Sequence, residues 1–567
     1  MARRIVRTAV QLVIATILFS IALLFLDRNY RVLPPSLHAY MPQHHHGLVV
    51  TDITISQCSS VNPFSSCDLD ANVWQRIGKD LYLGKAWVST AYLHVRRKKE
   101  EDLTEDDKVV MDISVGRLDP STAVGAEADT DEKWESRPGG LWVKRSSSKF
   151  ASDSDKAVTA IDVLFGDDAV EVREGWSIVG TNLLLESSSG IPGAYISVRR
   201  GAPKQIPKPV PRINDNGKFK IVQISDLHLS TGVGACRDAI PDTYQGRKCE
   251  ADPRTLDFVT KVIDEEKPDL IVFSGDQVNG DTSPDAQTAI FKYAHIAIKR
   301  KIPYVTIFGN HDDEQTLSRS AQMSIIEALP YSMSTAGPED LDGVGNYYIE
   351  VLARGHSDHS ALTLYMLDTH AYSSNEKKYP GYDWLKPNQV EWFKRTAASL
   401  KPAHREYTHI HMDLAFIHIP LPEYVGVQKF WKGAWREYVT APQYNSGFRD
   451  ALVEQGIVMV SCGHDHVNDY CMLSTEGEGD AKKPALWMCY AGGSGFGGYA
   501  GYGGYNRRLR VFEVDANLSR ITTWKRIEFG EPEELAKRVD EQVIVDGGRP
   551  IGPTMEEEAA EKEGPPL

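Results

Sequence analysis

Apolar runs alternate with helical patterns through the middle of this chain. Strand-like runs at 219–228, 268–276 and 302–312 are separated by segments with helical spacing at 252–267 and 283–301. This alternation predicts an α/β domain in which βαβ units surround a buried, largely parallel sheet. Further strands are expected at 361–368, 413–420, 456–466, 484–493 and 508–515, and a further helix at 386–401.

A different pattern precedes this region. From about residue 48 to 200, short runs rich in Val, Thr, Trp and Tyr recur between polar connectors that carry glycine. They predict a small β-rich domain, sandwich-like, without an internal repeat. We find no catalytic signature in it, and its role is unknown.

The N-terminus predicts a membrane anchor. Ala9–Leu26 contains no charged residue and would span about 27 Å as a helix, close to the bilayer core of about 30 Å. A cleaved signal peptide is the alternative, disfavoured because apolar residues continue past Ser20–Ala22. Arg3, Arg4 and Arg7 precede the run, so the positive-inside rule predicts a single-pass protein with a cytoplasmic N-terminus. The bulk of the chain would then be lumenal, in the endomembrane system or vacuole.

These patterns divide the chain into six parts. We expect a cytoplasmic tip and transmembrane anchor at 1–30, a linker at 31–47, the β-rich domain at 48–200, a Pro-rich linker at 201–217, the α/β domain at 218–530 and an acidic C-terminal tail at 531–567.

Charge and cysteines add two constraints. The formal net charge of −15 argues against a nucleic-acid partner, because phosphate binding needs a basic surface. Six of the seven cysteines form close-spaced couples that suit disulfides in an oxidising lumen, although reduced thiols in the cytosol stay possible. The couples are Cys58 with Cys67, Cys236 with Cys249, and Cys462 with Cys471, which leaves Cys489.

Polar residues of a few types follow five of the apolar runs. The side chains are Asp226 and His228, then Asp276, then Asn310 and His311, then His418, and finally His464 and His466. Because ligands bind at the carboxyl ends of strands in an open α/β sheet, we expect these residues to meet in one crevice. His409 and His411 are alternatives to His418, which we prefer because it ends the apolar run 413–420.

This set of two Asp, four His and one Asn offers more ligands than one tetrahedral metal ion needs. The set suits two adjacent metal ions with a carboxylate between them. Such a pair, about 3.5–4 Å apart, activates a shared hydroxide and clamps a transferring phosphoryl group. The sequence therefore predicts a binuclear metal centre that acts on phosphate esters.

The motif series D-x-H, G-D-x-x-x-G, G-N-H-D, a lone His and G-H-x-H, in this order, resembles the calcineurin-like metallophosphoesterase superfamily. The resemblance covers roughly 218–530 and implies a four-layer α/β/β/α sandwich. The stretches at 381–393 and 418–424 further resemble fungal membrane-anchored cell-cycle-regulator phosphatases and purple acid phosphatase 29-like proteins.

The resemblance also implies a role for each site residue. Asp226, His228 and His466 would hold the first metal, and Asn310, His418 and His464 the second, with Asp276 bridging. His311 would bind substrate beside Asn310 and act as the acid that protonates the leaving alkoxide, and Asp312 would orient it. Iron, zinc and manganese are candidate metals. Coloured purple acid phosphatases carry Tyr three residues after the bridging Asp, where this chain has Asn279, so no tyrosinate-to-iron colour is expected.

The expected function is hydrolysis of phosphomonoesters by a bridging hydroxide, on a phosphoprotein or a small phosphomonoester. A phosphodiesterase with the same centre is one alternative, and a non-catalytic phosphate-binding scaffold is another. The presence of a suitable residue at all seven ligand positions, and of His311, argues against the scaffold.

Overall fold

A computed structural model shows two compact units, 1–167 with 173–205 and 168–172 with 206–567. The structure describes residues 2–30, 47–62, 64–104, 106–122, 133–146, 156–185, 190–426, 431–478, 481–501, 505–530 and 537–552. The predicted linker at 31–47 lies outside them except for Gly47.

The predicted N-terminal helix forms as α1 (Ala2–Tyr30). Among the residues whose side chains are described, however, no helix is long and apolar enough to cross a membrane. Within the predicted span, those residues are 10–23, fewer than the roughly 20 that a bilayer requires, because Ala9 and 24–26 lie outside them. The structure therefore does not support the predicted transmembrane anchor.

The β-rich unit contains three antiparallel sheets of three strands each. Their strands are β1 (Leu48–Ser59), β2 (Gln75–Arg76) and β3 (Ser89–Lys99), β4 (Val110–Val115), β5 (Trp134–Arg137) and β6 (Leu141–Arg145), and β7 (Val158–Phe165), β8 (Trp176–Ile178) and β9 (Ala194–Arg200). Short 3-10 turns are η1 (Glu100–Asp102), η2 (Pro120–Thr122) and η3 (Pro138–Gly140). All three sheets contribute to one hydrophobic core.

These three sheets repeat one arrangement, which the sequence analysis missed. Each has its first strand paired with its third, and the third with its second. In each first strand an aspartate, Asp52, Asp112 or Asp162, accepts a hydrogen bond from the next residue's own N–H at 2.8–2.9 Å. The repeat escapes notice in the sequence because these aspartates are unequally spaced and the connectors differ in length.

The second unit contains two seven-stranded sheets. The first, in spatial order, is β14 (Tyr304–Ile307), β13 (Leu270–Ser274), β10 (Lys218–Ile224), β22 (Arg508–Asp515), β23 (Arg520–Ile527), β24 (Val539–Asp546) and β25 (Arg549–Pro550). The second is β15 (Tyr347–Leu352), β16 (Ser360–Met366), β17 (Met412–Phe416), β19 (Met459–Cys462), β21 (Lys483–Tyr490), β20 (Cys471–Glu476) and β18 (Trp431–Lys432). A small hairpin pairs β11 (Thr243–Tyr244) with β12 (Arg247–Lys248).

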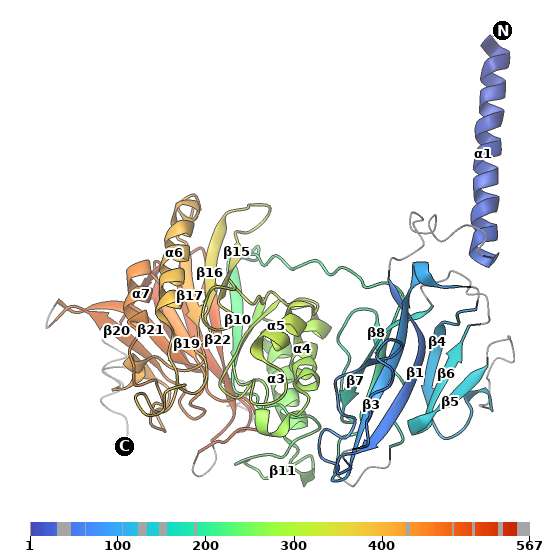
Figure 1. Cartoon of the computed structure of the whole chain (residues 1–567). Coiled ribbons are helices and arrows are strands. Elements are labelled where there is room, and N and C mark those ends of the chain that lie inside the picture. The colour runs from blue at the N-terminus through green and yellow to red at the C-terminus, as the bar shows by residue number, and fades with distance from the viewer. Residues whose placement is uncertain are drawn as a thin grey trace. The chain divides into compact units, whose positions relative to one another are not determined.

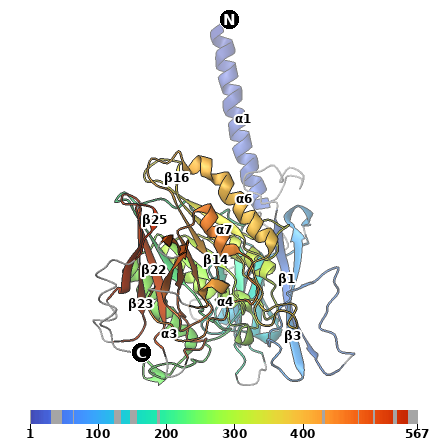
Figure 2. The ribbon, with the colours of Figure 1, turned by 90° about the vertical axis from the view of Figure 1, so that its left-hand side faces the viewer.

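Helices cover the outer faces of both sheets (Figures 1 and 2). They are α3 (Ala251–Glu266), α4 (Ala286–Arg300), α5 (Arg319–Glu327), α6 (Pro387–His404) and α7 (Phe448–Gln455), with 3-10 turns η4 (Gly280–Thr282) and η5 (Pro422–Tyr424). One apolar core, which includes Ile221 and Leu414, lies between the sheets. A second packs Tyr365 of the second sheet against Phe393 of α6. The α/β fold class is confirmed, with the expected four layers.

The prediction of one largely parallel sheet was wrong in one respect. β10, β13 and β14 are parallel, and so are β16, β17, β19 and β21, but the two sets belong to different sheets. Each sheet also contains antiparallel pairs, such as β10 with β22 and β15 with β16. Alternation along the chain shows that strands and helices follow one another. It does not show which strands are neighbours.

The C-terminal boundary also differs from the prediction. β24 and β25 fall within the predicted acidic tail, and Ile544 and Val545 are fully buried. This stretch forms a strand because it carries β-branched residues that pack in the core between the sheets. Residues 553–567 lie outside the described residues.

Two of the three cysteine couples form as predicted, Cys58–Cys67 and Cys236–Cys249. The third disulfide is Cys471–Cys489, and buried Cys462 is free. The predicted pairing of Cys471 with Cys462 was wrong, because the register of the strands determines which cysteines face each other. Cys471 and Cys489 stand opposite each other on antiparallel β20 and β21, with Cα atoms 4.0 Å apart.

A buried carboxylate joins the two sheets near their edge. Asp469, just before β20, accepts hydrogen bonds from Arg508 of β22 at 2.6 Å and from Tyr505 at 3.1 Å, and pairs with Lys525 of β23 at 2.9 Å. Burial raises the pKa of Asp469, but Lys525 and Arg508 outweigh burial and hold the pKa well below its usual range. The carboxylate is therefore ionised and neutralises two buried cations.

We expect Asp469→Asn to lower the free energy of unfolding by about 3–5 kcal/mol at neutral pH, because Arg508 then stays buried without its counter-ion and Lys525 keeps only Asp540. The depressed pKa makes this stabilisation present above the unfolded-state pKa of about 4 and lost as pH falls below it. Denaturant unfolding at several pH values measures the difference. Asp450→Asn, on an exposed side chain, is the matched control. Equal stability of Asp469→Asn and wild type would contradict this role.

Candidate metal centre

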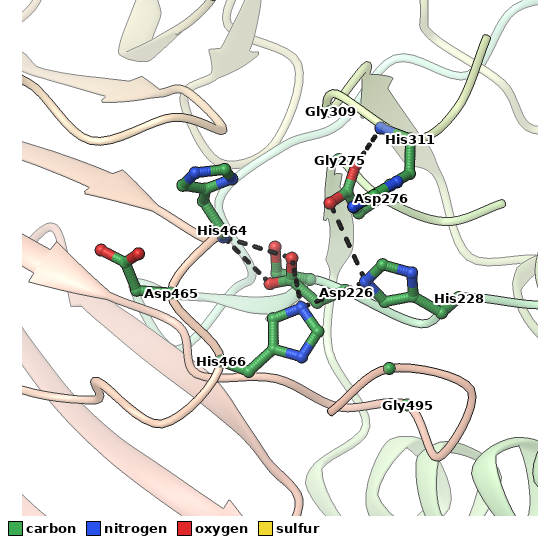
Figure 3. Close-up of polar contacts among 12 residues, drawn as sticks. Asp226, His228, Gly275, Asp276, Gly309, His311, His464, Asp465, His466 and Gly495 are labelled. Carbon is green, nitrogen blue, oxygen red and sulfur yellow. Dashed lines mark hydrogen bonds and ion pairs between the residues drawn. The ribbon is translucent and has the colours of Figure 1, made fainter. Parts of the chain in front are cut away.

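The predicted site residues converge at the carboxyl ends of five strands from both sheets. Asp226 and His228 follow β10, Asp276 follows β13, and Asn310 and His311 follow β14. His418 follows β17, and His464 and His466 follow β19 in the second sheet. Figure 3 shows Asp226, His228, Asp276, His311, His464 and His466 pointing toward one another. The site therefore lies where the two sheets meet, rather than along one sheet.

The backbone at this site adopts conformations that most residues avoid. Asp226, His228, Asp276 and His464 all have positive φ, between 47° and 78°. Such left-handed conformations are uncommon outside glycine and concentrate at functional sites. They turn the chain sharply at each strand end, so that the side chain points into the crevice.

Glycine precedes several of these residues because a side chain at those positions would collide with the neighbouring ligands. A Cβ on Gly275 would lie 2.3 Å from Nδ1 of His418, and one on Gly309 would lie 2.1 Å from Oδ1 of Asp276. Gly275 also has a φ of 99°. The G-D and G-N pairs of the sequence motifs thus allow backbone and ligands to approach closely.

The ligand atoms fall into two groups. Asp226, His228 and His466 offer atoms that all lie within 4.8 Å of one another, and so do Asp276, His418 and His464. Within the first group, Nε2 of His228 and Nε2 of His466 are 3.1 Å apart, and Nε2 of His466 is 3.4 Å from Oδ1 of Asp226.

Asp276 lies between the two groups. Its Oδ2 is 3.2 Å from Nε2 of His418 in the second group and 3.8 Å from Nε2 of His228 in the first. Its Oδ1 accepts the backbone N–H of His311 at 2.8 Å. One carboxylate oxygen thus faces both groups, which is the position that a bridging ligand requires.

These residues fit a pair of metal ions. Nε2 of His464 and Oδ1 of Asn310 are buried without a hydrogen-bond partner in the structure, although buried polar atoms are normally paired. Nδ1 of His418 faces the carbonyl of Ser274 at 2.9 Å, and Nδ1 of His466 faces the carbonyl of Tyr499 at 2.8 Å. These contacts direct Nε2 toward the centre, as in many metal-binding histidines.

Burial sets the charge of the imidazoles. It lowers the pKa of His228 and of His464 well below the usual value, so both are neutral, the form that binds metal. Burial raises the pKa of Asp276, but His418 and its neighbours outweigh burial and hold the pKa well below the usual range. The site therefore presents neutral nitrogen donors at His228 and His464 and an ionised carboxylate at Asp276. Burial lowers the pKa of His418 as well, but Asp276 outweighs burial and raises that pKa to about 9.

His311 lies at the rim of the site, with its ring centroid 5.3 Å from that of His228. Its Nδ1 pairs with Oε2 of Glu314 at 2.9 Å, a contact that the sequence analysis assigned to Asp312. Burial lowers the pKa of His311, but Asp276 and Glu314 outweigh burial and raise it. Glu314, four residues after Asn310, lies beyond the G-N-H-D motif and had no role in the sequence analysis.

Asp312 instead holds the strand ends in place. Its Oδ2 accepts the backbone N–H of Gly309 at 2.6 Å and of Asp276 at 2.9 Å, and its Oδ1 accepts that of Val278 at 2.9 Å. The carboxylate is 4% exposed. It therefore positions the loop that carries Asp276, and none of these three hydrogen bonds involves His311.

Aromatic side chains that the sequence analysis missed flank the centre. Tyr382 packs edge-on against His464, with ring centroids 4.3 Å apart, and stacks on Tyr372. On the other side Tyr499 stacks on His466 with centroids 4.0 Å apart, beside a cavity of about 720 Å³ that Arg436 also lines. The only sequence signal for them was the Tyr-rich composition of 372–382 and 495–505.

Comparisons with known proteins agree with this geometry. A family model described as "Calcineurin-like phosphoesterase" matches residues 219–468. "Phosphatase DCR2" of Saccharomyces cerevisiae is 38% identical over 414 residues, which cover 69% of this chain and 68% of that protein. This chain belongs to the calcineurin-like phosphoesterase family. The resemblance stated from the motifs is confirmed.

Two further relatives of this phosphoesterase differ in what their names say. An uncharacterized protein of Schizosaccharomyces pombe is 32% identical over 507 residues, covering 88% of this chain and 90% of that protein. "Probable inactive purple acid phosphatase 29" of Arabidopsis thaliana is 39% identical over 360 residues, covering 59% of this chain and 87% of that protein. The names "phosphatase" and "inactive" both occur among relatives, so turnover needs a direct test.

We expect Asp312→Asn to reduce the metal content of the phosphoesterase and to lower its free energy of unfolding by about 1–3 kcal/mol, because an amide NH2 would face a buried N–H donor. Elemental analysis and denaturant unfolding measure the two effects. Asp281→Asn, on a nearby exposed side chain, is the control. Full metal content and unchanged stability in Asp312→Asn would show that its hydrogen bonds do not position Asp276.

Proposed function

We propose that this phosphoesterase is a metal-dependent phosphatase that hydrolyses phosphomonoesters. The observation that carries the proposal is Asp276, whose Oδ2 faces His228 of one ligand group and His418 of the other. Two bound metal ions would supply Lewis-acid activation of water and neutralise charge on the phosphoryl group. Iron, zinc and manganese all accept this mixture of imidazole, carboxylate and amide donors.

The chain's own residues supply the remaining steps. His311 is the acid that donates a proton to the leaving alkoxide, since its raised pKa keeps the imidazolium populated and its partly exposed ring faces the rim. Glu314 holds that ring through Nδ1 and stabilises its charged form. Asn310, with its free Oδ1, belongs to the second ligand group, and its Nδ2 lies 3.5 Å from the hydroxyl of Tyr372.

The substrate we propose is a phosphoprotein or a small phosphomonoester. The name of the Saccharomyces cerevisiae relative supports phosphatase activity. A phosphodiesterase remains the second candidate, because the same ligand set serves either ester. A relative from Moraxella catarrhalis, 36% identical over 103 residues, is named "Probable cyclic nucleotide phosphodiesterase". Its name supports the phosphodiesterase as the second candidate function.

We also place the catalytic unit in an oxidising compartment, an endomembrane lumen or the vacuole. Cys236–Cys249 and Cys471–Cys489, both in this unit, support that location because disulfides persist where thiols are not kept reduced. Cytosolic phosphoproteins would then be out of reach.

The test is hydrolysis of an aryl phosphate monoester and an aryl phosphate diester by the full chain, with metal content measured on each sample. We expect monoester turnover, lowered about 10²–10⁴-fold by His311→Ala with metals retained, as for loss of a general acid. Asp276→Asn should lower both metal content and turnover.

Other outcomes separate the alternatives. Faster turnover of the diester would favour the phosphodiesterase. Two bound metals without turnover of either ester would favour a binding module. A wild-type chain that binds no metal would overturn the proposal.

A further inference from the structure

A second cluster of metal-binding side chains lies on the outer face of the second sheet, under α6. His404 from the end of α6, His411 just before β17 and Asp413 within β17 offer atoms that lie within 4.8 Å of one another. We propose that these three residues bind a divalent transition metal, with zinc preferred, at a structural site separate from the candidate binuclear centre.

The sheet register builds this site. Glu350 of β15 is paired with Thr363 of β16, and Thr363 with Asp413 of β17, so the three side chains form one row across adjacent strands. Their neighbours in the same strands, such as Leu364 and Leu414, point into the core between the sheets. Because side chains alternate along a strand, the row faces outward, toward α6.

The spacing of the donor atoms matches zinc coordination. Tetrahedral zinc with bonds of about 2.0–2.1 Å places its ligand atoms about 3.3 Å apart. Nε2 of His411 is 3.3 Å from Oδ1 of Asp413, and Oγ1 of Thr363 is 3.2 Å from Nε2 of His404 and 3.0 Å from Nε2 of His411. Oε1 of Glu350 lies 3.7 Å from Nε2 of His404, so Glu350 is our candidate for a fourth ligand.

The surroundings orient and retain these donors. Nδ1 of His411 faces the backbone carbonyl of Ser360 at 2.9 Å, which places the proton on Nδ1 and leaves Nε2 free to bind a metal. The side chains of His404 and His411 are 7% and 6% exposed. Among the described residues, neither Asp413 nor Glu350 has a lysine or arginine partner, so both carboxylates lack a permanent cation.

The two imidazoles also stack, with ring centroids 3.5 Å apart and an interplanar angle of 13°. The hydroxyl of Tyr365, on the same face as Thr363, is buried and has no hydrogen-bond partner among the described residues.

The decisive experiment compares zinc content after equilibration with Zn²⁺ and removal of loosely bound ions. We expect wild type to retain one zinc per chain more than the double variant His404→Gln/His411→Gln. His409→Gln, on the exposed histidine between them in sequence, should retain the wild-type content. An Asp276→Asn chain, in which the candidate binuclear centre is impaired, should still lose one zinc when His411→Gln is added.

A second measurement covers the case in which the double variant fails to fold. Asp413→Asn keeps the side-chain volume, and should weaken Zn²⁺ affinity at this site at least tenfold in a competition with a chelator. Equal zinc content in wild type and a folded double variant would overturn the proposal, as would unchanged affinity in Asp413→Asn. No measurement here depends on hydrolysis, so failure of this site and failure of the proposed phosphatase are distinguishable.

Discussion

The buried side chain of Gln223 joins the two sheets where the site forms. Its amide donates to Oγ of Ser274 in β13 at 2.9 Å, and its carbonyl accepts from Oγ of Ser461 in β19 at 2.5 Å. Each partner lies two or three residues before a candidate ligand, Asp276 or His464. Because an unpaired buried amide is costly, this three-way contact favours one relative position of the sheets. That position brings ligands from both sheets within reach of two shared metal ions.

The candidate centre also depends on backbone conformations that are unfavourable locally. Four ligand residues have positive φ, and such conformations cost on the order of 1–3 kcal/mol each. Two of them, those of Asp276 and His464, persist because fully buried strands, β13 and β19, precede them. Asp312 also accepts the backbone N–H of Asp276 and of Val278 in the segment that turns after β13. The rigid sheets therefore stabilise a geometry that an isolated loop would not adopt.

Sequence reasoning located the site because its signal is local. Each ligand follows an apolar run, and strand ends are visible from hydrophobicity alone. What it missed depends on contacts between distant segments. The partner of Cys471, the division of strands between two sheets and the role of Glu314 all follow from register or packing. The repeat in the β-rich unit is likewise a property of strand order, with Asp52 and its equivalents unequally spaced.

One short strand, β17, connects the two metal-binding clusters. His411 and Asp413 lie at its start, and His418 follows its end. Seven residues of extended chain separate the two histidines by about 20 Å, too far for their ions to share a ligand. The strand between them is buried on both faces and hydrogen-bonded on both sides, so it transmits little motion. A metal under α6 would therefore act by fixing α6 on the sheet. Its loss should be visible in the stability of the unit before it is visible in the chemistry at His418.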